Sequence, residues 1–275
     1  ENGANEFNES LRAAAGNGHI DIVELMIENR ANDFNRGLVA AADGGYNDIV
    51  VLMIRNGADN LDFALWAAAK NGHMDTVRLL LERGVPVEDY LLSLAALVGD
   101  IEMVKHMIPY GEESTYNAGL LEAIRGDHIE IAKMLVLKGA KNYNNALIMA
   151  ARKGNIDMVE LILETGAKDY DRALISAAKK GRMDVVKLIL EKGAKEYNGA
   201  LISAAKKGHM DVVELMLEMG ANNYNQALIT AAKNGQMKIV KLMVEMGAND
   251  YTGAMVSADK NGHMDTVQLM AENID

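Results

Sequence analysis

The chain has 275 residues, of which 49% are apolar and 24% charged, an ordinary composition for a soluble globular protein. It contains no cysteine, which excludes a disulfide framework, a thiolate zinc site and a cysteine nucleophile. The net charge of -11 argues against a general nucleic-acid binder, and no apolar run is long enough to span a bilayer. No signal-peptide pattern opens the chain. We therefore expect an intracellular protein with no membrane segment and no nucleic-acid partner.

One pattern recurs along the whole chain at intervals of 27 residues, as the tyrosines at 116, 143, 170, 197, 224 and 251 illustrate. One inserted residue, near Thr115, interrupts the interval. We predict a single repeat domain over residues 1–275, with units starting near residues 7, 34, 61, 88, 116, 143, 170, 197, 224 and 251. Residues 1–6 (ENGANE) resemble the end of a unit, such as EMGAND at 245–250. With no initiator methionine before them, they are expected to be the tail of a preceding repeat.

Within one unit, taken from residue 197, two short helices are expected. Asn198 is of a type that caps helix N-termini, so the first helix is predicted to start there, and Gly208 is predicted to end it. The second helix is expected to carry Asp211 in its first turn, where the helix dipole favours an anion, and to end at Gly220.

Each predicted helix has an apolar face that it cannot bury alone. In the first helix this face consists of Ala200, Leu201, Ala204 and Ala205. In the second helix the main apolar stripe is expected at Met210, Val213 and Leu217, widened by Val212, Leu215 and Met216. Because only a neighbouring unit can cover such faces, we predict an all-α solenoid of about ten helix-turn-helix units.

The consensus ALIxAAKxGHMDVVxLMLExGAN resembles the ankyrin repeat over essentially the whole chain. The unit is shorter than the usual ankyrin unit of about 33 residues, and the Thr-Pro-Leu-His turn is missing. The resemblance implies an ankyrin-type solenoid without the projecting hairpin. It also implies a non-catalytic protein-interaction module that uses no cofactor and binds along the concave face formed by the first helices.

Basic residues occupy the last turn of many first helices: Arg125, Arg152, Lys153, Lys179, Lys180, Lys206, Lys207, Lys233 and Lys260. The second helices carry most of the acid, so the molecule is expected to be basic along one ridge and acidic on its back. We predict that Arg152, Lys153, Lys180, Lys207 and Lys233 attract a protein partner with an acidic surface. The alternative is that these cations only stabilise helix C-termini.

Residues 61–114 depart most from the pattern and carry unusual apolar side chains. At five positions of these repeats (equivalent positions are called slots below), the side chain is apolar where other units mostly have a polar or smaller one. The five residues are Phe63, Trp66, Tyr90, Leu94 and Leu97. We predict that they are apolar anchors for the partner. Alternatively, Pro86, Pro109 and the inserted residue bend the stack, and these side chains fill the bend.

Histidines 19, 73, 128, 209 and 263 share one slot, but no two lie in adjacent units, so a shared metal ion is not expected. They are interpreted as turn residues bonded to the backbone. Phosphate-binding, nucleophile-elbow and zinc-protease motifs do not occur in the sequence. We therefore predict no catalytic residue. The remaining alternative is a structural component that packs through the ends or back of the solenoid.

Overall fold

A computed structural model describes residues 2–84 and 89–273, except for the side chains of residues 2–5, 89 and 90. Within these residues every regular element is helical, as 20 α-helices and one short 3-10 helix, and none is a strand. The all-α prediction is confirmed. The chain divides into two compact units, Glu1–Lys141 and Asn142–Asp275.

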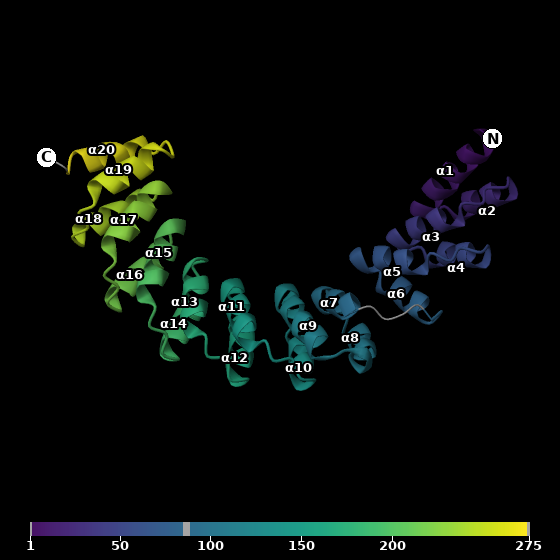
Figure 1. The fold of residues 1–275 in the computed structure, drawn as a ribbon, viewed down its shortest axis with the longest axis horizontal. Coiled ribbons are helices and arrows are strands. Elements are labelled where there is room, and N and C mark those ends of the chain that lie inside the picture. Colours follow the sequence, from purple (N-terminus) through teal and green to yellow (C-terminus); the bar gives the residue numbers. More distant parts are fainter. Residues whose placement is uncertain (1, 85–88, 274–275) are drawn as a thin grey trace. The chain divides into compact units, whose positions relative to one another are not determined.

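The first unit contains α1 (Asn2–Gly16), α2 (Ile20–Glu28), α3 (Phe34–Asp43), α4 (Asn47–Arg55), α5 (Leu61–Lys70), α6 (Met74–Leu81), α7 (Asp89–Val98), α8 (Ile101–Met107), η1 (Ile108–Tyr110), α9 (Glu113–Gly126) and α10 (Ile129–Leu137). The second unit contains α11 (Tyr143–Lys153), α12 (Ile156–Glu164), α13 (Tyr170–Ala178), α14 (Met183–Glu191), α15 (Tyr197–Lys207), α16 (Met210–Glu218), α17 (Tyr224–Lys233), α18 (Met237–Glu245), α19 (Tyr251–Asp259) and α20 (Met264–Ala271). Within each unit the odd-numbered first helices pack on one another in a row, and each second helix packs on its own first helix (Figure 1).

The helices of the second unit begin where the sequence period places them. Each of its five first helices starts at the tyrosine that opens its repeat. In the first unit, α9 starts at Glu113 and is 14 residues long, against 9 to 11 residues for first helices in the second unit. The inserted residue near Thr115 thus coincides with a longer helix, while Pro86 lies outside the described residues. That all ten helix pairs form one domain remains a prediction.

The asparagines predicted to cap the first helices have another role. Asn198 lies inside α15, and its Oδ1 accepts hydrogen bonds from the backbone N–H groups of Asn222 and Asn223, each at 2.9 Å. Those two residues form the loop before the next first helix. Side chains in the same slot bind the following loop in the same way at Asn8, Asn35, Asn117, Asn144, Asp171 and Asn225.

The capping prediction is therefore wrong, because the acceptor points to the next repeat and not to its own helix. Four helices are capped instead by the acidic residue directly before them. Asp33, Asp169, Glu196 and Asp250 accept from the backbone N–H three residues later.

That residues 1–6 are the tail of a preceding repeat remains a prediction. Residues 2–6 form the first turns of α1 and not the loop that ends a repeat.

The core of each repeat lies between its two helices and those of its neighbours. Ala200, Leu201, Ala204 and Ala205 are completely buried, as predicted. In α16 the completely buried residues are Val212, Val213 and Met216, whereas Met210 and Leu217 are only half-buried. The predicted stripe was thus rotated, because α16 is flanked by both α14 and α18 as well as by α15.

The turn glycines have two functions, which Gly181 illustrates. Its φ is +64°, a left-handed conformation that L side chains rarely adopt. A Cβ at this position would also lie 2.6 Å from Nδ1 of His209, which packs against the turn from the next repeat. Gly193 has φ +100°, but a Cβ there would meet nothing within 4 Å.

Replacing Asn198 with alanine should weaken the junction between α15 and the loop before α17. We expect the free energy of local opening to fall by about 1–2 kcal/mol, since two backbone hydrogen bonds are lost. Amide hydrogen exchange should accelerate at Asn222 and Asn223. Asn198→Asp is the control, because Asp171 already serves as the acceptor in the same slot. Faster exchange confined to the first turn of α15 would restore the capping interpretation.

Alanine at either of the two glycines should destabilise the protein, but by different amounts. Gly193→Ala should cost about 1 kcal/mol for backbone strain alone. Gly181→Ala should cost roughly 1 kcal/mol more, because the new methyl group collides with His209. The excess should disappear in a His209→Ala background, measured as a double-mutant cycle in urea denaturation. Equal costs in both backgrounds would mean that the histidine contact is unimportant.

Candidate functional site

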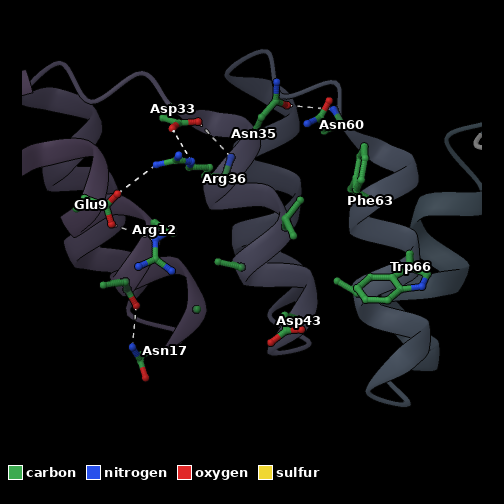
Figure 2. Close-up of a pocket in the computed structure, with 15 residues that line it drawn as sticks. Glu9, Arg12, Asn17, Asp33, Asn35, Arg36, Asp43, Asn60, Phe63 and Trp66 are labelled. Carbon is green, nitrogen blue, oxygen red and sulfur yellow. Dashed lines mark hydrogen bonds and ion pairs between the residues drawn. The ribbon is translucent and has the colours of Figure 1, made fainter. Parts of the chain in front are cut away.

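An open groove crosses the exposed face of the first helices α1, α3 and α5 (Figure 2). Its volume is about 1020 Å³. It is lined by Glu9, Arg12, Ala13, Gly16, Asn17, Asp33, Asn35, Arg36, Val39, Ala40, Asp43, Asn60, Phe63, Trp66 and Ala67. Most of these residues are the solvent-facing members of helices whose opposite faces form the repeat core.

One end of the groove carries a charged network. Arg36 lies between two carboxylates, with Nη1 at 3.1 Å from Glu9 and Nε at 3.5 Å from Asp33. Arg12 also contacts Glu9, at 3.2 Å. Because these side chains are largely exposed, each ion pair contributes little to stability. Together they form a charged network along the groove wall.

The other end of the groove is aromatic. Phe63 and Trp66 lie three residues apart on the same face of α5, and they are 65% and 49% exposed. Lys70 Nζ lies 4.8 Å from the centroid of the Trp66 ring, within range of a cation–π interaction. Val39 and Ala40 of α3 also line the groove, so its lining combines apolar side chains with the charged network.

The other predicted anchors are not part of this groove. Leu94 and Leu97 are half-buried on α7, against which α9 packs closely. The Leu97 carbonyl lies 3.1 Å from His128 Nε2 of the next repeat, a hydrogen-bond contact. Tyr90 belongs to α7, but its side chain lies outside the described residues. Among the predicted anchors whose side chains are described, the structure therefore brings together Phe63 and Trp66.

The predicted basic residues all lie exposed at the ends of first helices. Arg125, in the first unit, forms an ion pair with Glu122 at 2.7 Å. The second helices are less uniformly acidic than expected. Lys187 on α14 and Lys238 and Lys241 on α18 are exposed among the carboxylates.

Four of the turn histidines contact the preceding repeat. The His128 ring reaches the Leu97 carbonyl, as expected of a histidine bonded to backbone. His73, His209 and His263 lie against the turn glycines Gly45, Gly181 and Gly235. Among the described residues, no group of three or more histidine, aspartate or glutamate side chains could hold a metal ion.

Away from the groove, the pKa of the Glu102 carboxyl is lowered. Lys105 donates a hydrogen bond to Glu102 at 2.7 Å on α8, and this bond together with the lysine charge lowers the pKa of the carboxyl. α8 does not contribute to the groove lining.

Glu9, Arg12 and Arg36 were not predicted as site residues. They occupy the third and sixth slots of their repeats, and Phe63 and Trp66 occupy the same slots of the third repeat. Alignment of the exposed slots across the first three repeats would have indicated them. What the sequence could not indicate is that α1, α3 and α5 leave an open groove between these side chains.

A family model for ankyrin repeats (3 copies) matches residues 38–118, 92–172, 120–199, 164–227 and 201–275. The chain belongs to the ankyrin repeat family. Ankyrin repeats generally mediate protein–protein interaction, and proteins built from them are typically non-catalytic interaction modules. A search of curated proteins returned no match. In the described part of the chain, no helix is both long and apolar enough to cross a membrane.

Proposed function

We propose that this ankyrin repeat chain is a non-catalytic module that binds a protein partner along the exposed faces of its first helices. The supporting observation is the groove over α1, α3 and α5, in which two aromatic rings lie exposed next to a charged network. Large exposed aromatic side chains in a groove are typical anchors for partner side chains. The proposal includes no catalytic residue, no cofactor and no nucleic acid.

In the first unit, the partner segment would place an apolar side chain against Phe63 and Trp66. Its polar neighbours would face Glu9, Arg12 and Arg36. Leu94 and Leu97 on α7, together with Tyr90, remain proposed as further anchors. The alternative is that these side chains fill a bend in the stack of helices.

In the second unit, an acidic partner surface would face the cations Arg152, Lys153, Lys180, Lys207 and Lys233. Each of these side chains is exposed, and exposed charges of one sign steer the association of an oppositely charged partner. The same cations also stabilise helix C-termini, and the two effects are compatible. We further propose an intracellular location, since a chain without cysteine suits a reducing compartment.

A second candidate function is that of a structural component joined through the edge formed by α2. Ile22 and Leu25 on α2 are 45% and 50% exposed, whereas Ile49, in the same slot as Ile22, is 2% exposed. These exposed apolar side chains favour contact between the α2 edges of two copies, related by a two-fold axis.

The groove can be tested with a Phe63→Ser/Trp66→Ser double variant. Proteins captured from lysate by the native chain are identified, produced separately and measured for affinity against each variant. We expect the double variant to bind roughly tenfold or more weakly, because two aromatic anchors are lost. Circular dichroism should show unchanged helix content, since both side chains are exposed.

Leu137→Ser is the matched control, because this leucine is 84% exposed on α10, outside the groove. It should bind as tightly as the native chain. Partners that bind the double variant with native affinity would show that Phe63 and Trp66 are not anchors.

The second candidate predicts self-association through the α2 edge. Sedimentation velocity of the native chain should show a concentration-dependent dimer, because dimerisation would cover Ile22 and Leu25. An Ile22→Ser/Leu25→Ser variant should remain monomeric. A native chain that is monomeric over the same concentration range would rule out this mode of assembly.

A further inference from the structure

The second unit carries a regular array of cations. The first helices α11, α13, α15, α17 and α19 pack side by side in this order. Each presents a cation in the same slot, and all five are exposed: Arg152, Lys179, Lys206, Lys233 and Lys260. Within residues 142–273, the structure pairs none of these five with a carboxylate; its ion pair there joins Arg172 and Asp169. The array is thus available to an external anion.

A row of aliphatic side chains runs parallel to the cations. It consists of Ile148, Ile175, Ile202, Ile229 and Val256, each at least partly accessible. In each helix this residue precedes the cation by four positions, which places both on one face of the helix. The small side chains of Ser176, Ser203, Thr230 and Ser257 each follow the aliphatic residue by one position and are partly accessible. Four successive helices therefore repeat one strip of aliphatic, hydroxyl and cationic groups.

The spacing of the cations determines which backbone conformation of a bound chain segment can place one side chain at each cation. Packed helices lie about 8–10 Å apart. A polyproline II segment rises about 3.1 Å per residue with three residues per turn, so it presents the same face roughly every 9 Å. A β-strand repeats its face every two residues, about 6.7 Å. An α-helix repeats its face every turn of about 5.4 Å, so only alternate turns would meet a cation.

We propose that the first helices of the second unit bind an acidic protein segment in polyproline II conformation, with Asp or Glu at every third residue. Its carboxylates meet the cation row, and one apolar side chain per turn meets the aliphatic row. This inference rests on the proposed function and specifies the partner chemistry for one of its surfaces.

Charge and composition favour a protein segment over a single-stranded nucleic acid. The chain has a net charge of -11, and the second helices of the same unit carry exposed carboxylates such as Glu160 and Glu214. Single-strand binders stack bases on aromatic side chains. Residues 142–275 contain no phenylalanine or tryptophan, and Tyr143, Tyr197 and Tyr224 are half-buried.

The test uses the full chain and labelled peptides, with affinity measured by fluorescence anisotropy. One peptide carries five Glu-Pro-Val triplets, one has the same composition in scrambled order, and one is helical with glutamate at every seventh residue. We expect the triplet peptide to bind roughly tenfold more tightly than the scrambled one. A Lys179→Ser/Lys206→Ser/Lys233→Ser variant should lose this preference. The matched control, Lys187→Ser/Lys238→Ser/Lys241→Ser, removes three exposed lysines from second helices and should retain it.

Equal binding of the triplet and scrambled peptides, tighter binding of the helical peptide or of oligodeoxythymidine, or equal loss in both lysine variants would overturn the inference. The captured partner is measured against the same variants. If its affinity falls in the first-helix lysine variant while the peptides show no preference, only the polyproline II inference fails. If the partner binds these variants and the groove double variant with native affinity, the proposed function fails.

Discussion

The structure depends on the contact between successive helix pairs. A pair has two apolar faces and can cover neither by itself, so its stability comes from the pairs on either side. Small alanines such as Ala200 and Ala204 let the next first helix approach closely. Asn198 fixes how successive repeats align, because its side chain accepts hydrogen bonds from the loop that leads into the next repeat. The apolar contact supplies most of the energy, and the hydrogen bonds hold the register.

This arrangement separates packing from recognition within a single short helix. In α5, Ala64, Leu65 and Ala68 are completely buried, while Phe63 and Trp66 face solvent. The buried slots repeat because each first helix packs on its neighbours through the same face. The exposed slots are not constrained by that interface, so they differ between repeats. Aromatic rings and an arginine–carboxylate network share one groove in the first unit, whereas cations recur at every first helix of the second.

Short-range patterns predicted the elements well and the long-range bonds poorly. The 27-residue period placed the starts of α11, α13, α15, α17 and α19 at their tyrosines. The pattern also identified Asn198 as a hydrogen-bond acceptor but assigned it the wrong donors. Those donors lie 24 and 25 residues later, and a helical pattern carries no information about contacts at that separation. The buried stripe of α16 was misplaced for a similar reason, since its neighbours α14 and α18 decide which side is covered.

By itself, the sequence determined the repeat, the helix pairs, the all-α class and the family, because local periodicity and turn glycines encode them. Only the tertiary structure decided which exposed residues lie together. Phe63 and Trp66 face a groove with Arg36 because α3 and α5 pack side by side, whereas Leu94 and Leu97 are half-buried on α7. The sequence predicts all four of these side chains to be exposed, although Phe63 and Trp66 occupy the third and sixth slots and Leu94 and Leu97 the seventh and tenth. How deeply each is covered depends on how closely the neighbouring helices approach, which no single repeat specifies.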